Sequence, residues 1–188
     1  MKQIVAILAL LAISQSASAA FCGLFLNGPN EYYPIRFKKP IVQRQVLDVK
    51  GAAPLEMMKM VVSNREEVFH LGKKAWKVTG TLERTILGKP TETHSYVFYE
   101  YYTDEAVYRE ANGKWELDMM FPKDGLEFKT YGYYNNKWKY IGDYITPNGK
   151  KYKKAFALHT ELRTSIYVPG LGPIVQEIPG SYRYEVEL

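Results

Sequence analysis

The chain has 188 residues, a formal net charge of +5 and 46% hydrophobic residues. A chain of this length suits a single domain with a full core, and its mild positive charge favours anionic surfaces without indicating a nucleic-acid partner. Cys22 is the only cysteine, so the chain can form no internal disulfide, and no Asn-x-Ser/Thr glycosylation sequence occurs. For an exported chain, these features fit a bacterial envelope better than a eukaryotic exterior.

Residues 1–19 have the pattern of a cleavable secretory signal peptide. Lys2 precedes an unbroken apolar run over 4–13, and Ala17-Ser18-Ala19 supplies the small residues that signal peptidase requires. The run is about half of the roughly 20 residues that a membrane-spanning helix needs. We therefore predict a signal peptide over 1–19 and a single domain over 20–188, located in the periplasm or secreted.

Cys22 lies close to the predicted mature N-terminus, where lipidation is an alternative to a free thiol. A lipobox places a small residue directly before the cysteine, whereas this chain has Phe21 there. We therefore expect an unpaired thiol at Cys22, and the sequence leaves its role open.

The segment 54–71 is the region in which a helix competes with a strand. Ser63-Asn64-Arg65-Glu66 has the spacing of a capping box, and Gly72 stands where the C-terminal cap of a helix would lie. These signals predict a short helix over 64–71. Residues 55–62 are rich in Met and Val and fit either a helix or a strand.

From Ala75 onward, apolar and polar residues alternate with the period of two that is typical of half-buried strands. Residues 94–102 are aromatic on both faces, which indicates a strand that is covered on both sides. Asn112-Gly113 is the strongest short hairpin signal, and the strand after it has one apolar face, formed by Trp115, Leu117, Met119 and Phe121. We place the three tryptophans in the core, namely Trp76, Trp115 and Trp138.

The second half of the chain repeats the hairpin pattern. Asn112-Gly113-Lys114-Trp115 recurs as Asn135-Asn136-Lys137-Trp138, so we expect a turn at 135–136 between strands over 126–134 and 137–145. Residues 151–168 keep their apolar side chains on one parity and predict a long strand that bends at a bulge.

Together these patterns predict a mainly β fold of about 8–10 antiparallel strands with one short helix. A meander of this size must close or curl over to protect its edge strands. We therefore expect the domain over 20–188 to be an up-and-down barrel or a strongly curved half-barrel.

The sequence contains no serine-hydrolase elbow, zinc-protease motif, P-loop or dinucleotide-binding glycine motif. His159 and Glu161 lie two residues apart on one strand face and could form an acid–base or metal pair, but no third ligand has a defined spacing. We therefore predict no catalytic residue, metal or cofactor and favour a non-enzymatic protein. An enzyme of unrecognised class is the alternative.

Two groups of residues are candidates for binding. Over 137–154 the chain carries six lysines against the single acid Asp143, namely Lys137, Lys139, Lys150, Lys151, Lys153 and Lys154. They predict contact with an anionic partner such as lipid headgroups, the alternative being a solvated hairpin that resists edge aggregation. Tyrosine offers amphipathic contact surface for a ligand, or fills a barrel interior, and the candidates of this kind are Tyr131, Tyr133 and Tyr134.

These observations predict an exported, non-enzymatic binding or interaction protein of the bacterial envelope. It would hold an apolar or amphipathic ligand inside a β-barrel or contact an anionic ligand or an envelope surface. A small outer-membrane β-barrel is the alternative, because its strands alternate in the same way. No nucleic-acid partner is expected, and the sequence leaves the ligand and the oligomeric state open.

Overall fold

The computed structural model describes residues 29–34, 40–46, 56–178 and 182–187. The predicted signal peptide over 1–19 and Cys22 lie outside these ranges. Within the described part, the regular elements are β-strands, and the expected short helix is not formed.

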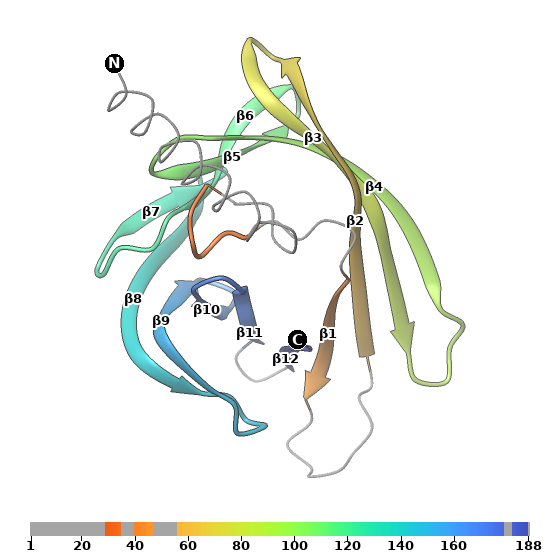
Figure 1. Cartoon of the computed structure of the whole chain (residues 1–188), viewed down its shortest axis with the longest axis vertical. Coiled ribbons are helices and arrows are strands. Elements are labelled where there is room, and N and C mark those ends of the chain that lie inside the picture. Colours follow the sequence, from red (N-terminus) through yellow and green to blue (C-terminus); the bar gives the residue numbers. More distant parts are fainter. Residues whose placement is uncertain (1–28, 35–39, 47–55, 179–181, 188) are drawn as a thin grey trace, which may run out of the picture.

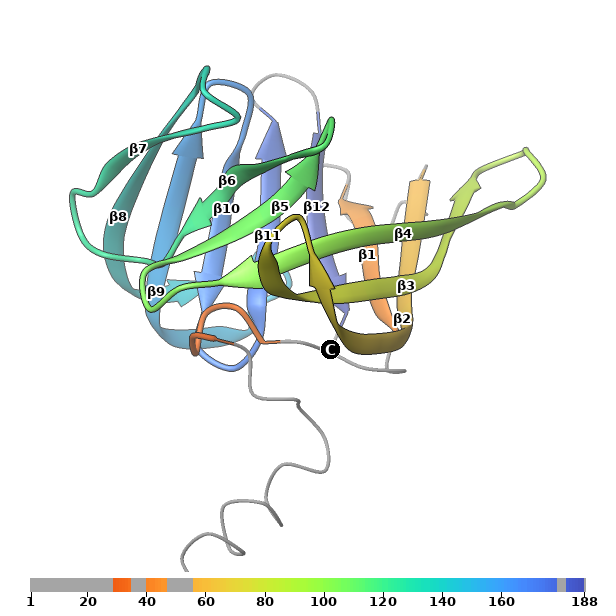
Figure 2. The same ribbon diagram turned by 90° about the horizontal axis from the view of Figure 1, so that it is seen from above.

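Twelve strands form one antiparallel sheet that curls into a nearly closed barrel (Figure 1 and Figure 2). β1 to β6 pair in sequence order, β7 to β12 do the same, and β1 pairs with β12. The predicted antiparallel barrel or half-barrel is therefore confirmed, with more strands than expected. The strands are β1 (Ile41–Val46), β2 (Glu56–His70), β3 (Lys73–Ile86), β4 (Glu92–Tyr102), β5 (Ala106–Ala111), β6 (Lys114–Met120), β7 (Glu127–Thr130), β8 (Tyr134–Ile145), β9 (Lys151–Thr160), β10 (Thr164–Val168), β11 (Gly172–Ile178) and β12 (Tyr182–Glu187).

The prediction of a helix over 64–71 was wrong, because this segment is the second half of β2. β2 pairs with β3 from Glu56 to His70, so the undecided residues are also strand. Ser63, the expected helix cap, lies at a register shift between Val62 and Asn64 and donates its hydroxyl to the Thr79 carbonyl oxygen (3.3 Å). Residues that can cap a helix also serve bulges and turns, which is why the local pattern misleads here.

Two predicted connections also differ. Residues 151–168 form the hairpin of β9 and β10 rather than one bent strand, and its turn is fixed by the Thr160 amide donating to the Arg163 carbonyl oxygen (2.9 Å). The turn expected at 135–136 lies instead at 131–133, where Tyr131 (φ 50°) and Gly132 (φ 75°) adopt the left-handed backbone.

β6 and β7 are the two ends of the sheet, and a few contacts join them. The Tyr131 amide donates to the Leu117 carbonyl oxygen (3.3 Å), and the Trp138 indole donates to the Met120 carbonyl oxygen (2.8 Å). In the described part of the chain, the barrel therefore closes between β6 and β7 through isolated hydrogen bonds and side-chain packing, and not through a continuous ladder of backbone hydrogen bonds.

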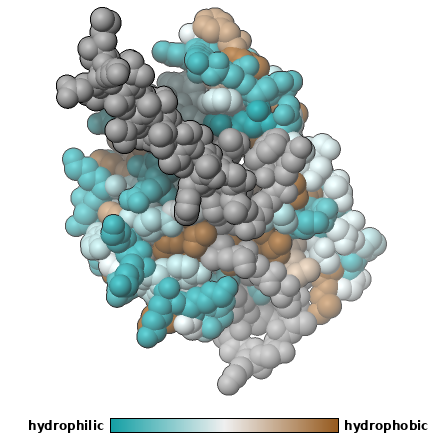
Figure 3. Space-filling model, viewed as in Figure 1, coloured by the Kyte–Doolittle hydropathy of each residue, from teal (hydrophilic) through white to brown (hydrophobic). Residues whose placement is uncertain are grey.

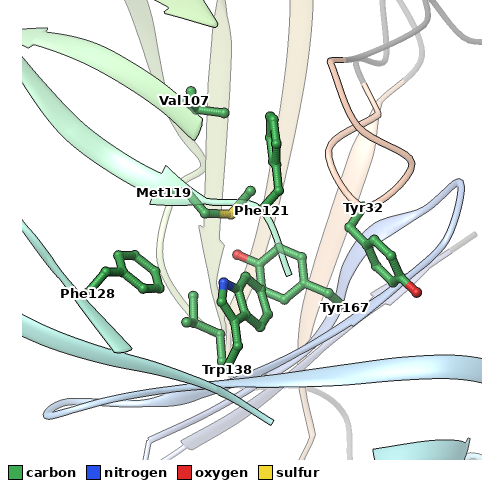
Figure 4. Close-up of a cluster of buried hydrophobic side chains, with 8 residues drawn as sticks. Tyr32, Val107, Met119, Phe121, Phe128, Trp138 and Tyr167 are labelled. Carbon is green, nitrogen blue, oxygen red and sulfur yellow. The ribbon is translucent and has the colours of Figure 1, made fainter. Parts of the chain in front are cut away.

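The main core lies inside the barrel around Trp138, which is 0% exposed (Figure 4). Its ring packs edge-to-face on Tyr167, with centroids 5.0 Å apart, and burial of such large rings dominates core energetics. The other buried members of this cluster are Tyr32, Val107, Met119, Phe121, Phe128 and Leu158.

The turn at 29–34 folds against this core. The Tyr32 hydroxyl donates to the Lys154 carbonyl oxygen (2.8 Å), and the Gly170 amide donates to the Glu31 carbonyl oxygen (2.7 Å). These bonds hold the neighbouring Tyr33 at the interior, where its hydroxyl donates to Glu100 (3.1 Å).

Trp115 was expected in this core, but it lies on the outer face of the barrel. A register shift between Val107 and Tyr108 interrupts the β5–β6 pairing, so Met119 is buried inside while Trp115 packs outside on Tyr101 (ring centroids 4.9 Å). We call the rings gathered there the outer aromatic cluster; they are His70, Tyr99, Tyr101, Tyr108 and Trp115.

A second apolar cluster forms between the outer face of β9–β11 and the far end of the β8–β9 hairpin. Register shifts on both sides of Gly142 (φ 72°) bend β8, so that Ile141, Tyr144 and Tyr152 pack onto the sheet. The residues that they cover are Ala155, Ala157, Ile166, Val168, Ile174 and Val175.

Candidate functional site

A cavity of about 510 Å³ lies between β6 and the strands β8 to β11. At its deep end the lining residues are buried, among them Met119, Leu158 and Tyr167. At its mouth the lining includes Leu162, which is 64% exposed, and the exposed Arg163 of the β9–β10 turn. The cavity therefore leads from the surface into the barrel interior.

One wall of the cavity is charged. Arg109 of β5 lies 3.2 Å from an Asp118 carboxylate oxygen of β6, and the Tyr131 hydroxyl donates to the same carboxylate (2.7 Å). In the ladder Arg109 stands opposite Glu116, and the register shift in β5–β6 turns Asp118 towards it. The guanidinium also lies over the Phe98 ring, 4.6 Å from its centroid.

Behind this wall lies Glu100 of β4, which is only 2% exposed. It accepts hydrogen bonds from the hydroxyls of Tyr33 (3.1 Å) and Tyr102, and it lies 3.9 Å from Arg109. Arg65 donates to the Tyr102 hydroxyl (2.8 Å). A buried carboxylate needs such partners, because removing it from water without them is costly.

Arg65 completes a balanced set of charges. Its guanidinium stacks on the Trp76 ring, 3.8 Å from the centroid; Trp76 was predicted in the core, but it is half-buried and lies outside both apolar clusters. Two guanidinium groups thus face two carboxylates, Glu100 and Asp118, within one network of hydrogen bonds and ion pairs.

The surroundings shift the pKa values of Tyr33, Tyr131 and Arg109 away from neutral pH. Burial and then the Glu100 charge raise the pKa of Tyr33 well above its ordinary value, and burial with the Asp118 hydrogen bond raises the pKa of Tyr131 to about 12. Burial alone would lower the pKa of Arg109, but Tyr33, Asp118 and Glu100 raise it overall. The phenols are therefore fixed hydrogen-bond donors and the guanidinium a fixed cation, which suits recognition better than proton transfer.

Part of the lining is apolar. It includes Met119, Leu158, Leu162, Tyr167 and Ile178. Burial raises the pKa of Tyr167 to about 12, so this phenol is also neutral. A ligand in the cavity would meet both fixed polar groups and hydrocarbon.

The structure separates the three candidate tyrosines. Tyr131 lies in the charged wall, and Tyr134, 36% exposed, lines the cavity with it. Tyr133 is 63% exposed and packs on Tyr134, with ring centroids 4.2 Å apart, without lining the cavity.

The six candidate lysines are all exposed and lie on the hairpin of β8 and β9. Lys137 pairs with Glu127 (2.6 Å). Lys150 lowers the pKa of Glu185 through its charge without forming a close ion pair. The other members form no ion pair in the part of the chain that the structure describes, and they are Lys139, Lys151, Lys153 and Lys154.

His159 and Glu161 do not engage each other. The His159 Nδ1 lies 3.1 Å from the Thr164 hydroxyl, and Glu161 accepts from the Asn135 amide. Both line a surface depression of about 550 Å³ between β7, β8 and β9. Among the described residues, no group of three or more His, Cys, Asp or Glu side chains could hold a metal ion.

Sequence reasoning missed the charged wall. Glu100 did carry a signal, because it is the one acid among the aromatic residues of 94–102, a stretch expected to be covered on both faces. Arg109 and Asp118 flank the hairpin predicted at Asn112-Gly113, but no local pattern shows that Arg65 of β2 joins them.

No helix in the described ranges has the length and apolar character needed to cross a membrane. Comparisons with protein-family models, with curated proteins and with solved structures found no match to this chain.

Proposed function

We propose that this protein is an exported, non-enzymatic binding protein that holds an amphipathic small molecule inside its barrel. The observation that carries the proposal is the cavity of about 510 Å³, whose lining combines charged and apolar side chains. Small-molecule sites commonly have volumes of about 300–1,000 Å³ and combine hydrocarbon lining with a few fixed polar groups.

The charges indicate how such a molecule would lie. Arg109 is already bound by Asp118, whereas Arg163 at the mouth has no carboxylate partner among the described residues. An anionic head group would therefore contact Arg163, and the apolar part would extend along Leu158 and Tyr167.

Two further observations favour this function over the alternatives. The groups around the cavity are held as donors and cations at neutral pH, which argues for binding rather than for acid–base catalysis. Ion pairs such as Lys59–Glu83 (3.0 Å) and Lys77–Glu66 (3.2 Å) lie along the outer face of β2 and β3. Such charges suit a water-facing exterior better than the lipid-facing band of an outer-membrane barrel.

A second candidate is contact with an anionic envelope surface. It is supported by the five exposed lysines on the β8–β9 hairpin that form no close ion pair in the described part of the chain. This role concerns a different face and is compatible with a ligand in the cavity.

The export half of the proposal rests on the pattern in residues 1–19. The intact mass of the protein recovered from the envelope should match a chain that begins at Ala20 or Phe21. A mass increase of one diacylglycerol on Cys22 would instead indicate a lipoprotein.

The binding half is tested with undecanoic acid that carries a dansyl group, a fluorescent carboxylate amphiphile. The wild-type protein should bind it saturably, and Leu162→Asp should weaken binding about tenfold by charging the mouth. Leu87→Asp is the matched control, because Leu87 is 63% exposed, like Leu162 at 64%, but lies at the β3–β4 turn. Absence of saturable binding, or equal loss in both variants, would refute the cavity as the site.

A further inference from the structure

The turn between β2 and β3 presents apolar side chains to solvent. Phe69 is 81% exposed, the highest value among the large apolar side chains of the described residues, and Leu71 is 45% exposed. The turn projects from the barrel at the upper end of Figure 1, and apolar surface gathers at the same place in Figure 3. We call residues 69–72 the apolar tip.

The backbone of the apolar tip is one that leucine disfavours. Leu71 and Gly72 have φ values of 43° and 72°, and the β5–β6 turn at Asn112 and Gly113 has 52° and 74°. Such turns favour Asn-Gly, because a side chain other than that of Asn or Asp pays a steric penalty at positive φ. The chain has the favoured Asn-Gly pair at 112–113 but has leucine at 71. The exposed Leu71 therefore lowers the stability of the β2–β3 turn.

The outer aromatic cluster holds the apolar tip in place. The Trp115 indole donates to the Leu71 carbonyl oxygen (3.2 Å), and the His70 ring stacks on Tyr99 with centroids 3.9 Å apart. The tip is thus a braced projection, with Trp115 and two tyrosines directly behind two apolar side chains.

Lysines lie next along the same strands. The Lys73 ammonium is 5.8 Å from the centroid of the Tyr101 ring, and Lys114 directly precedes Trp115 and is exposed. Neither has a carboxylate partner among the described residues, whereas Lys74 pairs with Glu67 (2.8 Å). Aromatic rings and lysines therefore both flank the apolar tip, and Lys73 pairs with His70 at the first ladder position beside the turn.

We propose that the apolar tip docks on an anionic lipid surface. Phe69 and Leu71 enter the outer hydrocarbon, Trp115 and its neighbouring tyrosines lie at headgroup depth, and Lys73 and Lys114 face the lipid phosphates. Exposed apolar, aromatic and lysine side chains gathered in this way are typical of protein segments that lie at a bilayer surface. A protein partner is less suited, since a stable protein interface buries about 800 Å² on each side and this projection offers two side chains. The inference concerns a separate surface and does not depend on the cavity.

The test uses the full mature chain and vesicles of phosphatidylcholine with a minority of phosphatidylglycerol. Binding is measured at about 0.1 M and about 1 M salt, because the Debye length falls from about 10 Å to about 3 Å and screens the β8–β9 lysines. The binding that persists at high salt should fall about tenfold or more in Phe69→Ser. Leu87→Ser, which removes an apolar side chain that is 63% exposed at another turn, should bind like the wild type.

A second variant separates docking from folding. Leu71→Asn should raise the melting temperature, because asparagine tolerates positive φ, and should lower vesicle binding. The Trp115 emission should shift to shorter wavelength with vesicles in the wild type and not in Phe69→Ser. The proposal is overturned if the wild type does not bind, if Phe69→Ser or Leu71→Asn binds normally, or if Leu87→Ser loses as much. It is also overturned if sedimentation shows a dimer that Phe69→Ser converts to a monomer, since the tip then serves a second copy of the chain.

Discussion

Trp115 and Trp138 follow the same local sequence, Asn-x-Lys-Trp, yet they lie on opposite faces of the barrel wall. Each indole donates to a backbone carbonyl, that of Leu71 (3.2 Å) or Met120 (2.8 Å). Trp138 is 0% exposed inside the barrel, whereas Trp115 is half-buried in the outer aromatic cluster.

The difference arises from where the asparagines lie. Asn112 lies in the β5–β6 turn, whereas Asn135, its counterpart in the repeat, lies within β8 and donates its side-chain amide to Glu161. A register shift between Val107 and Tyr108 then turns Trp115 outward. Local sequence therefore predicts that a segment is a strand, whereas the pairing of the strands decides which face of the sheet a residue occupies.

The largest expected effect is at the inner tryptophan. Trp138→Ala should lower the free energy of unfolding by about 3–5 kcal/mol, because it opens a cavity and removes the hydrogen bond that joins β8 to Met120. Urea denaturation measures this loss. A change below about 1 kcal/mol would contradict the assignment of Trp138 to the core.

The next effect concerns alkaline pH. The pKa of Tyr167, which packs on Trp138, is raised by burial from 10.0 to about 12 in the folded protein. Below pH 10 the Tyr167 phenol is protonated in both the folded and the unfolded protein, so it contributes fully to the free energy of unfolding. As the pH rises from 10 towards 12, this phenol ionises only in the unfolded chain, and the free energy of unfolding falls. The loss attributable to Tyr167 should reach about 2–3 kcal/mol.

The matched variants are Tyr167→Phe and Tyr101→Phe. Urea denaturation at about pH 9 and about pH 12 should show a smaller alkaline loss in Tyr167→Phe than in the wild type. Tyr101, against Trp115, is less buried, and burial raises its pKa less. If the two variants reduce the alkaline loss of stability equally, the proposed difference in burial between the inner core and the outer aromatic cluster is wrong.

Trp115→Ala should have a smaller effect than Trp138→Ala. A half-buried ring on the outer face leaves a gap that water can fill, so we expect a loss of about 1–2 kcal/mol in urea denaturation. A loss as large as that of Trp138→Ala would mean that the outer aromatic cluster is a second core.

The smallest effect on folding is expected at the lysines of the β8–β9 hairpin. Changing Lys150, Lys151, Lys153 and Lys154 to Gln should leave the melting temperature nearly unchanged, because exposed charges contribute little to stability. If these lysines contact an anionic surface, the salt-sensitive part of binding to anionic vesicles should be clearly smaller in this variant than in the wild type. If the wild type binds anionic and neutral vesicles equally at low salt, these lysines do not contact lipid headgroups, and their role is to keep the hairpin soluble.

The antiparallel barrel could be predicted because alternation and turn dipeptides are local signals, and they were correct at Asn112-Gly113 and through most of β3 to β6. The helix over 64–71 could not be excluded, since Ser63 and Gly72 fit a cap as well as a bulge and a turn.

The candidate site was harder to predict than the fold. Tyr131 was identified from aromatic density, but its partner Asp118 reaches it only because the barrel brings β6 beside the 131–133 turn. Glu100 and Arg109 are direct partners in the β4–β5 ladder, whereas Arg65 reaches them from β2, on the other side of β3, and no short motif in a single sequence encodes that meeting.

The pairing of β1 with β12 has a consequence for the order of folding. Val42 pairs with Glu187, so this contact spans nearly the whole domain, whereas the other strand pairs join neighbours in sequence. Hairpins between neighbours form within about 1–10 μs, but closing β1 on β12 must first bring distant chain segments together. Closure is therefore a late event, and substitutions in β1 or β12 should mainly accelerate unfolding, whereas substitutions in the hairpins that form early should slow folding.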